Sequence, residues 1–459
     1  MLGVGKIKNI HFIGIGGIGM SGMAELLYRT GYFISGSDLE QNERTRFLSN
    51  LGLDISIGHK ENNVINASLV VFSSAVKEDN IEIKRARDLG VPVMRRAEML
   101  AELVRIKPLS IGVSGTHGKT TTCSLIGSVL HRAKKDPTIV IGGIVKEFDT
   151  NAISGKGEVI VVEADEYDKT FLSLHPVISI INNIEEEHLD CYRDFSDLKN
   201  AFQQFANNIP FYGFVLANSD DSGVSEIISN INRPVVKYGL DKEADYNARN
   251  ITFLNNNSKF DLYRKNKKID TIELIIPGLH NIYNSLCAIS LCLELGVDIK
   301  IIKASLKEFK GVKRRFDIKY NNKGNLYIDD YAHHPTEIKT TIDAAKKGWP
   351  DKRIVSVFQP HLYSRTKSFY KDFAKALFDS DQVVLLDIYG ARESKIDGVS
   401  SSLIKDEIIN SGNKNCIIVD SDKLVRKLKE IYQDNQIIIT MGAGDLWRKG
   451  EDIVKNIYE

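Results

Sequence analysis

Short apolar runs alternate with apolar residues at helical spacing along this chain, and the alternation restarts three times. In the first segment a helix is predicted after Gly19, where methionines and leucines recur at intervals of three and four residues. The predicted strands of this segment are Ile10–Ile13, Phe33–Ser35, Leu69–Phe72 and Val91–Met94. Strands separated by helices indicate a mostly parallel sheet with helices on both faces.

The second segment begins after Pro108 with predicted strands at Thr138–Ile141, Val159–Glu163, Val177–Ile181 and Phe214–Ala217. A polar stretch from about residue 246 to 276 carries a turn signal at Asn255–Ser258 and predicts hairpins, followed by helices at Asn281–Leu295 and Ile299–Phe309. Strands of the third segment are predicted at Leu326–Ile328, Ile354–Phe358, Gln382–Leu386, Cys416–Val419 and Gln436–Thr440. We therefore predict an α/β protein of three domains.

Composition narrows the range of functions. The chain has 459 residues, of which 42% are hydrophobic and 26% charged, as expected of a globular protein. A formal charge of +1, with no basic run interleaved with aromatic residues, argues against nucleic acid as a partner. The five scattered cysteines lack metal-ligand spacing and are typical of a reducing compartment, so we expect a cytoplasmic location. No apolar stretch approaches the length of a membrane span, and no membrane partner is expected.

The most informative segment is Ile111–Thr122, where a short apolar strand leads into a glycine-rich turn and then into an apolar helix. Backbone N–H groups of such a turn can bind phosphates, Lys119 adds a positive charge, and the Thr120 hydroxyl can ligate magnesium. The spacing differs from a strict Walker A motif, because Val113 stands where that motif has glycine and the glycine lies at Gly115. The segment predicts binding of ATP or GTP.

A second glycine-rich loop, Gly14–Gly19, follows the first predicted strand and has the pattern G-x-G-x-x-G. Asp38 follows at the end of the second strand. The glycines allow the backbone to approach a pyrophosphate, and the carboxylate can bind ribose hydroxyls, so NAD, FAD and a UDP-sugar all fit. The alternative that the loop is only a tight turn and binds no ligand also remains. Two phosphate cradles are what a ligase needs if it joins a nucleotide-activated substrate at the expense of ATP, whereas a dehydrogenase needs one.

Acidic residues follow two strands of the second segment. Glu163 ends the apolar strand Val159–Glu163, at the position where P-loop folds hold magnesium. His188 follows an acidic run just past the next strand and could ligate a second divalent ion. A solvated acidic turn and a structural histidine are the simpler alternatives.

These motifs resemble, in the same order, those of the Mur ligases of peptidoglycan synthesis, and the resemblance covers essentially the whole chain. The blocks that carry it in the second segment are Gly115–Thr121, Glu163–Glu166, Asn183–Asp190 and His280–Asn284. Six further blocks are similar to those of the family members that add the first amino acid: Gly14–Gly22, Gly36–Asp38, Ser73–Ala75, Gly311–Phe316, Asp329–Pro335 and Gln359–Thr366. One departure lies in the last block, where Leu362 replaces an arginine.

The resemblance implies roles for individual residues. The implied ATP ligands are Gly115, Thr116, His117, Gly118, Lys119, Thr120, Thr121, Asn281, Asn284, Arg315, Asp330 and Tyr331. For the UDP-sugar they are Gly16, Gly17, Ile18, Gly19, Asp38, His59 and Ser73. The implied ligands of magnesium, expected as two ions, are Thr120, Glu163 and His188. The implied catalytic residues are Lys119, His361 and Arg365.

The resemblance also implies a domain plan and an activity. Residues 1–107 would form a Rossmann-like UDP-sugar-binding domain, residues 108–311 a central P-loop ATPase-like domain, and residues 312–459 a C-terminal Rossmann-like ligase domain. The implied reaction joins L-alanine to the carboxylate of UDP-N-acetylmuramate through an acyl phosphate and releases ADP and phosphate, in a monomer or weak homodimer. Two alternatives stay open: a ligase that recycles muropeptides by attaching a peptide to the same UDP-sugar, and a nicotinamide-dependent oxidoreductase that uses Gly14–Asp38.

Overall fold

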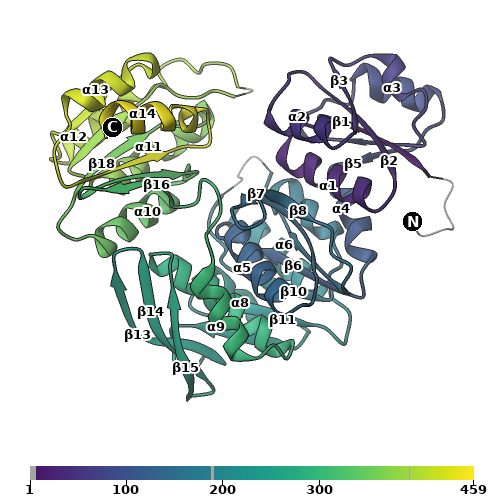
Figure 1. Ribbon diagram of the computed structural model, residues 1–459, viewed down its shortest axis with the longest axis horizontal. Helices are drawn as coiled ribbons and strands as arrows, with labels where there is room; N and C mark the ends of the chain where they lie inside the picture. Colours follow the sequence, from purple (N-terminus) through teal and green to yellow (C-terminus); the bar gives the residue numbers. More distant parts are fainter. Residues whose placement is uncertain (1–6, 188–190, 392, 459) are drawn as a thin grey trace. The chain divides into compact units, whose positions relative to one another are not determined.

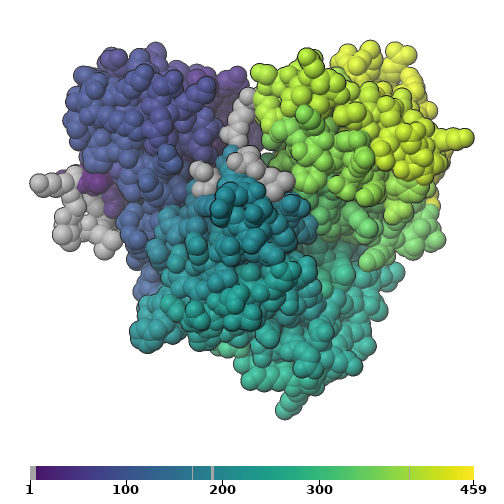
Figure 2. Space-filling view, turned by 180° about the vertical axis from the view of Figure 1, so that it is seen from behind, coloured from purple at the N-terminus to yellow at the C-terminus, as the bar shows by residue number. Residues whose placement is uncertain are grey.

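The structure is a computed structural model that describes residues 7–187, 191–391 and 393–458 (Figure 1). Figure 2 shows the chain as filled spheres, with the remaining residues in grey. Contacts divide the chain into two compact units. Unit 1 comprises residues 1–249, 262–270 and 283–309, and unit 2 comprises residues 250–261, 271–282 and 310–459.

The first sheet of unit 1 has five parallel strands in the order β3-β2-β1-β4-β5. Their bounds are β1 (Asn9–Ile13), β2 (Phe33–Asp38), β3 (Asp54–Ile57), β4 (Leu69–Phe72) and β5 (Val93–Arg95). The helices are α1 (Ile18–Arg29), α2 (Glu43–Asn50), α3 (Ile81–Asp88) and α4 (Arg96–Arg105). Because the strands are parallel, β1, β2 and β3 present Gly14, Asp38 and Gly58 at one edge of the sheet, where α/β folds bind ligands.

The second sheet has ten strands in the order β15-β14-β13-β12-β11-β10-β6-β9-β7-β8, and the division between the units crosses β13, β14, β15 and α8. Its strands are β6 (Leu109–Ser114), β7 (Thr138–Val145), β8 (Thr150–Ile153), β9 (Val159–Glu163), β10 (Ile178–Ile181), β11 (Phe214–Asn218), β12 (Val235–Gly239), β13 (Tyr246–Leu254), β14 (Asn257–Arg264) and β15 (Lys267–Leu274). The helices are α5 (Lys119–Arg132), α6 (Phe195–Asn207), α7 (Ser222–Ile228), α8 (Leu279–Glu294) and α9 (Ile299–Glu308). Strand β6 lies between β10 and β9 and is parallel to both, so three strand tips meet beside the glycine-rich turn.

The core beneath that turn depends on a close contact between β6 and α6. A Cβ atom at Gly112 would lie 3.1 Å from the Phe205 ring and 3.0 Å from the Pro176 ring. Phe205 stacks on Phe171 with ring centroids 5.0 Å apart, and Phe171 meets Phe202 edge to face at 5.1 Å. All three phenylalanines are fully buried, so this cluster fixes the distance between β6 and α6.

Unit 2 contains a six-stranded sheet in the order β16-β17-β21-β18-β19-β20. Strand β16 is antiparallel to β17, and the other neighbours are parallel. The strands are β16 (Asp317–Asn322), β17 (Asn325–Asp330), β18 (Arg353–Phe358), β19 (Gln382–Leu385), β20 (Cys416–Ile418) and β21 (Gln436–Met441). The helices are α10 (Pro335–Gly348), α11 (Tyr363–Leu377), α12 (Ser402–Asn410), α13 (Leu424–Glu430) and α14 (Gly450–Ile457).

The predicted α/β class with mostly parallel sheets is confirmed. The strands predicted from apolar runs are present, with ends that differ by one to three residues in most cases. Sequence patterns missed β3, β8, β12 and β16. These strands are short or polar. In addition, β3 and β16 are edge strands with exposed residues, and an exposed strand does not need a run of apolar side chains.

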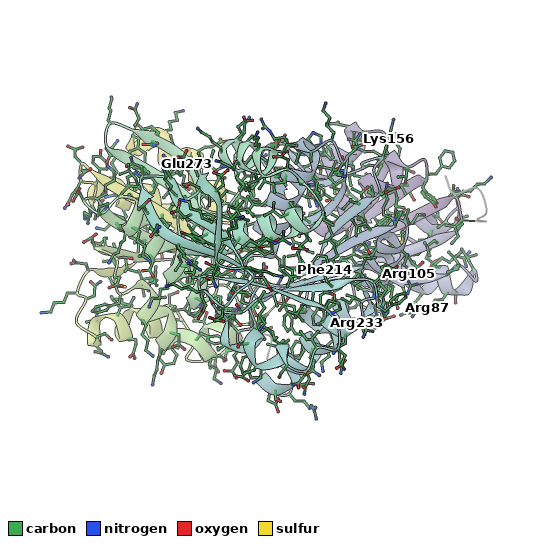
Figure 3. The ribbon with its side chains drawn as sticks, turned by 90° about the horizontal axis from the view of Figure 1, so that it is seen from below. Arg87, Arg105, Lys156, Phe214, Arg233 and Glu273 are labelled. Carbon is green, nitrogen blue, oxygen red and sulfur yellow. The ribbon has the colours of Figure 1, made fainter. Side chains whose placement is uncertain are left out.

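Arginines on the surface of unit 1 form local ion pairs. Arg87 of α3 pairs with Glu78, and Arg105 of α4 pairs with Glu102; both arginines are labelled in Figure 3. Exposed pairs of this kind contribute about 0–1 kcal/mol each, so they matter little for stability. No helix within the described residues combines the length and apolar character needed to traverse a bilayer.

We predict that Phe205→Ala lowers the free energy of unfolding by about 3–5 kcal/mol, because it leaves a cavity under Gly112. Phe211→Ala is the matched control, since the Phe211 side chain is 86% exposed, and it should change stability by no more than about 0.5 kcal/mol. Denaturant unfolding followed by circular dichroism would measure both. Equal effects of the two substitutions would contradict the assigned core.

Candidate active site

The glycine-rich turn between β6 and α5 has a backbone that only glycine accommodates. Gly115 has φ +137° and Gly118, which caps α5, has φ +81°. A Cβ atom at Gly115 would lie 2.9 Å from Asn182 Cβ, and one at Gly118 would lie 2.6 Å from Asn284 Oδ1. No acidic residue lies in the first turn of α5, so its N-terminal N–H groups suit an anion. The glycine-rich turn that the sequence predicts before this helix is therefore present.

Asn183 holds this turn in place from the tip of β10. Its Oδ1 accepts a hydrogen bond from His117 N (2.7 Å), its Nδ2 donates to His117 O (3.2 Å), and its carbonyl accepts from Thr116 N (3.2 Å). The sequence showed Asn183 as the start of a motif without indicating this role. The available signal was its position directly after a buried strand beside the turn.

Lys119 forms a buried ion pair with Glu166. Its Nζ donates to Glu166 Oε2 (2.7 Å) and Oε1 (3.0 Å) and to the carbonyl of Gly115 (2.7 Å). Burial would lower the pKa of Lys119, but the charges of Glu166 and Asp165 outweigh it and raise the pKa above its ordinary value. The lysine is thus a permanent cation beside the phosphate cradle. Glu166 as its partner is a residue that sequence reasoning missed.

Two of the three predicted magnesium ligands, Thr120 and Glu163, lie among the residues that the structure describes. Thr120 lies in the first turn of α5 and is buried, and Glu163 ends β9. Glu163 Oε1 accepts a hydrogen bond from Gly142 N (2.8 Å), which orients the carboxylate. A hydroxyl and a carboxylate are the oxygen ligands that magnesium prefers, so these residues fit that ion. His188 lies outside the described residues.

Asn284 of α8 is joined to the same loop by a chain of hydrogen bonds. Tyr238 donates to Asn182 Oδ1 (3.0 Å), Asn182 Nδ2 donates to Thr122 Oγ1 (3.1 Å), and Thr122 donates to Asn284 Oδ1 (3.2 Å). All four side chains are buried. The structure therefore brings this predicted adenine ligand to the helix that begins at the phosphate cradle.

The first glycine loop is hydrogen-bonded to Asp38, the acidic residue of its sequence fingerprint. Asp38 Oδ2 accepts a hydrogen bond from Gly16 N (2.7 Å). Gly17 is the N-cap residue of α1 and has no side chain with which to cap the N–H groups of the first turn. Gly14 has φ +77°, and a Cβ there would lie 3.1 Å from Ser73 Cβ. Asp38, Ser73 and the loop thus meet at the carboxyl edge of the first sheet.

Three further residues of this predicted site differ in their surroundings. Ile18 is 43% exposed although it is apolar, which suits a residue that a ligand covers. A Cβ at Gly19 would lie 2.7 Å from the Arg96 guanidinium. His59 follows β3 and bonds through Nδ1 to Ser37 Oγ (3.1 Å).

In unit 2, Arg315, Asp330 and Tyr331 form one cluster. The Arg315 guanidinium lies 5.2 Å from the centre of the Tyr331 ring. Asp330 accepts hydrogen bonds from the backbone N–H groups of Phe316 (2.7 Å) and Ala332 (2.8 Å). Burial raises the pKa of Asp330 to about 6, although Arg315 and these donors oppose the shift.

Asn281, the other predicted adenine ligand, is counted with unit 2 and donates through Nδ2 to Pro277 O (2.7 Å). The neighbouring His280 has a pKa lowered to about 4, by burial and then by the charge of Arg315. The His280 ring is therefore neutral at physiological pH. Asn281 and Asn284 belong to one helix, α8, but fall on either side of the division between the units.

His361 and Arg365 are neighbours at the start of α11. Arg365 Nη1 lies 3.5 Å from His361 Nδ1, and the His361 ring stacks on Tyr389 with centroids 5.9 Å apart. Between them, Leu362 has φ +71°, a conformation that strains a residue with a Cβ. Thr366 donates twice to the Leu362 carbonyl and Leu362 N donates to Tyr389 O, so the surroundings hold this backbone. Stored strain of this kind is typical of functional sites.

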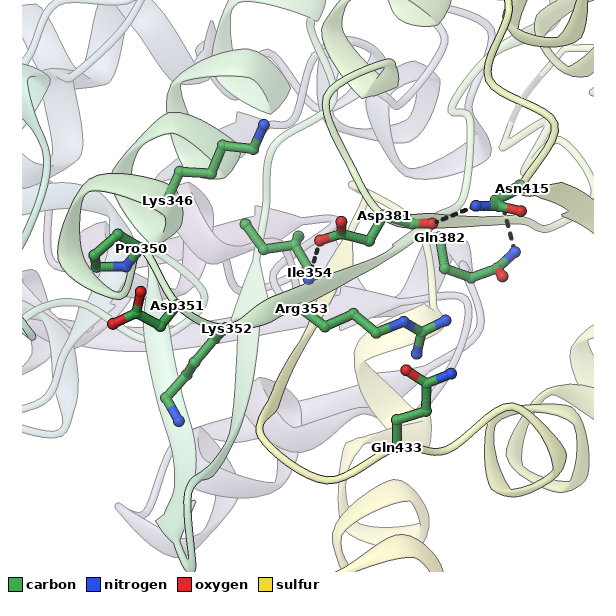
Figure 4. A pocket seen from close by; sticks show the side chains of 10 residues that line it. All are labelled: Lys346, Pro350, Asp351, Lys352, Arg353, Ile354, Asp381, Gln382, Asn415 and Gln433. Carbon is green, nitrogen blue, oxygen red and sulfur yellow. Dashed lines mark hydrogen bonds between the residues drawn. The ribbon is translucent and has the colours of Figure 1, made fainter.

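A large polar pocket in unit 2 lies elsewhere. It has a volume of about 990 Å³ and lies at the amino ends of β18 and β19, opposite the edge where α/β sheets bind ligands. Its cations are engaged: Lys352 donates to Gly324 O and Asn435 Oδ1, and Arg353 donates to Gln436 Oε1. Figure 4 shows the Asp381 carboxylate on the backbone of Ile354. The pocket lies between loops at this end of the sheet and is not a candidate active site.

Comparison with known protein families settles the affiliation. Residues 9–107 match the Mur ligase family catalytic domain, residues 113–292 the Mur ligase middle domain, and residues 314–444 the Mur ligase glutamate ligase domain. The chain belongs to the Mur ligase family. The resemblance predicted from the motifs is thereby confirmed.

Individual Mur ligases match this chain over its whole length. The UDP-N-acetylmuramate–L-alanine ligase of Sulfurihydrogenibium sp. (strain YO3AOP1) is 46% identical over 455 residues, which cover 99% of each chain. That of Aquifex aeolicus (strain VF5) is 43% identical over 452 residues and 98% of each chain. The crystal structure of the Thermotoga maritima UDP-N-acetylmuramate–alanine ligase is similar with a TM-score of 0.83 at 32% identity, over 98% of each chain.

We predict that Asn183→Ala weakens ATP binding in this Mur ligase, because the clamp on His117 loses two hydrogen bonds. At about 0.5–1.5 kcal/mol per bond, KM for ATP should rise roughly tenfold or more. Asn208→Ala is the control, since Asn208 donates to Leu172 O at the far end of α6. An unchanged KM for ATP in Asn183→Ala would contradict the role of the clamp.

Proposed function

We propose that this Mur ligase joins L-alanine to the carboxylate of UDP-N-acetylmuramate at the expense of ATP. The products are UDP-N-acetylmuramoyl-L-alanine, ADP and phosphate, and the reaction serves peptidoglycan synthesis. The observation that carries the proposal is the identity of 43–46% with curated UDP-N-acetylmuramate–L-alanine ligases over at least 98% of the chain. The two glycine cradles of unit 1 support it, because one can hold each nucleotide.

The cradle at Gly115–Thr121 is proposed to bind the ATP phosphates. Lys119 neutralises the β- and γ-phosphate oxygens as the substrate carboxylate attacks the γ-phosphorus. Because Lys119 Nζ is paired with Glu166 in the structure, it has to leave Glu166 for a phosphate oxygen or contact both groups at once. Asn284 and Asn281 are proposed to bind the adenine, and Thr116, His117 and Thr121 complete the loop.

Thr120, Glu163 and His188 are proposed to hold magnesium, as two ions. When bound, the metal lowers the repulsion between the phosphate and the carboxylate that attacks it. The hydrogen bond from Gly142 N to Glu163 Oε1 holds this carboxylate in one orientation at the end of β9. The first glycine loop, Gly16–Gly19, with Asp38, His59 and Ser73, is proposed to bind the UDP moiety.

Residues of unit 2 are proposed to serve both halves of the reaction. Arg315, Asp330 and Tyr331 contribute to ATP binding, and Arg365 with His361 meets the muramate carboxylate or the alanine. The first step releases ADP and leaves an acyl phosphate; in the second step the alanine nitrogen attacks its acyl carbon, phosphate leaves, and the amine loses a proton. His361, held on Tyr389, is the proposed acceptor of that proton. We propose a monomer or weak homodimer as the working form.

The test is a phosphate-release assay across amino acids. ADP and phosphate should appear only when ATP, magnesium, UDP-N-acetylmuramate and L-alanine are all present. Turnover of a peptide such as L-alanyl-γ-D-glutamyl-meso-diaminopimelate without turnover of free alanine would overturn the proposal in favour of muropeptide recycling. Binding of NAD(P) by the whole chain, with no UDP binding, would favour an oxidoreductase instead.

We predict that Lys119→Ala reduces kcat at least about a hundredfold, because the developing charge on the γ-phosphate loses its buried cation. Binding of the UDP-sugar, measured by calorimetry, should change less than about twofold, since the first glycine loop lies on another sheet. Lys107→Ala is a control lysine: it donates to Gly155 O and Gly157 O at the base of the sheet. Retained activity in Lys119→Ala would refute the assignment of the loop.

A further inference from the structure

Glu82, in the first turn of α3, is a buried carboxylate with no part in the reaction described above. It is 0% exposed. Its Oε2 accepts a hydrogen bond from Ser37 Oγ (2.5 Å), and its Oε1 accepts from Lys60 N (3.1 Å) and Asn63 Nδ2 (2.5 Å). One carboxylate thus binds the end of β2 and the loop that follows β3.

Two histidines complete the surroundings of Glu82. His11 Nε2 of β1 lies 3.6 Å from Oε2, and His59 Nδ1 lies 3.3 Å from the same atom. Burial would raise the pKa of Glu82, but the neighbouring His11 and hydrogen bonds from Ser37 and Asn63 outweigh it and lower the pKa to about 2. The carboxylate is therefore ionised at neutral pH and acts only as an acceptor.

The contacts of His59 determine where its ring proton lies. The Ser37 hydroxyl has a single proton, which it donates to Glu82. His59 Nδ1 lies 3.1 Å from Ser37 Oγ and 3.3 Å from Glu82 Oε2, so both of these neighbours are acceptors. Nδ1 must then carry a proton, so that when the ring holds a single proton Nε2 is a hydrogen-bond acceptor.

His59 lies at the ligand-binding edge of the first sheet. Gly58 N donates to Asp38 O (2.8 Å), and the Asp38 side chain accepts from Gly16 N of the glycine loop (2.7 Å). The His59 side chain is 13% exposed and that of Glu82 is 0% exposed. A ligand at this edge can therefore reach His59 while Glu82 stays covered.

We propose that Glu82 is a positioning residue of the UDP-sugar site: it holds His59 in the Nδ1–H tautomer, so that Nε2 accepts a hydrogen bond from the uridine. This inference rests on the proposed function, because it takes the first glycine loop as the UDP-sugar site. Uridine offers two kinds of donor, the N3–H of uracil and the ribose hydroxyls. Both present the same chemistry to Nε2, and nucleotide analogues distinguish them.

The first experiment measures UDP and ATP binding to the full chain by calorimetry. In Glu82→Gln the single amide oxygen cannot accept from both the Ser37 side and the Lys60 side, so the Kd for UDP should rise about tenfold. The Kd for ATP should change less than about twofold. The matched control is Glu25→Gln, because Glu25 is also buried but bonds to Arg29, Arg44 and Thr150.

The second experiment observes the tautomer itself. Two-bond ¹⁵N–¹H spectra of the histidine rings, with His59 assigned from the spectrum of His59→Gln, should show His59 protonated at Nδ1. Glu82→Gln should shift His59 towards a mixture of tautomers. A role in packing alone would leave the tautomer unchanged, and protonation at Nε2 in the unaltered chain would overturn the proposal.

Analogues then identify the donor. N3-methyl-UDP should bind about tenfold more weakly than UDP if the base donates, and 2′- or 3′-deoxy-UDP should do so if the ribose donates. In His59→Gln the same analogues should lose little relative to UDP. Equal binding of UDP and all three analogues by the unaltered chain would overturn the inference. Failure of the unaltered chain to bind UDP at all would contradict the proposed function instead, and the tautomer spectrum would still test Glu82.

Discussion

The close approach of the glycine-rich turn to the tip of β10 is the constraint on which the site depends. Gly115 and Gly118 have positive φ and no room for a Cβ, since Asn182 and Asn284 occupy that space. Asn183 then fixes the turn through the backbone of His117. This packing directs the N–H groups of the turn and of α5 towards one point, which is what a triphosphate needs. The phenylalanines that pack against Gly112 fix the distance between β6 and α6, and the position of the turn depends on this distance as well.

The same geometric rule operates in each of the three sheets. Parallel strands place their carboxyl ends together, so residues that follow different strands become neighbours. Gly14 and Asp38 meet in this way on the first sheet, and Gly115 meets Asn183 on the second. On the third, His361 follows β18 and pairs by a β-bridge with Tyr389. One kind of scaffold thus brings residues from distant parts of the chain together on each sheet.

Sequence patterns predicted most of the fold and the backbone-determined part of the site. Glycine loops are visible in a sequence because few other residues adopt their φ angles, and buried parallel strands appear as apolar runs. The partners of buried charges were not predictable. Glu82 lies in a charged run that is typical of an exposed helix, yet it is fully buried, because its donors come from β2 and the segment after β3. Glu166 became the partner of Lys119 for the same reason: such pairing depends on tertiary contacts between distant segments.

Glu166 is, in effect, a competitor for Lys119 that is tethered to the same chain. A tethered group has an effective concentration on the order of mM or higher, which an anion from solution has to exceed. A lone phosphate ion can contact only some of the N–H groups of the turn and helix, whereas a triphosphate is long enough to contact more of them at once. The loop therefore selects its occupant by the number of contacts it makes as well as by charge.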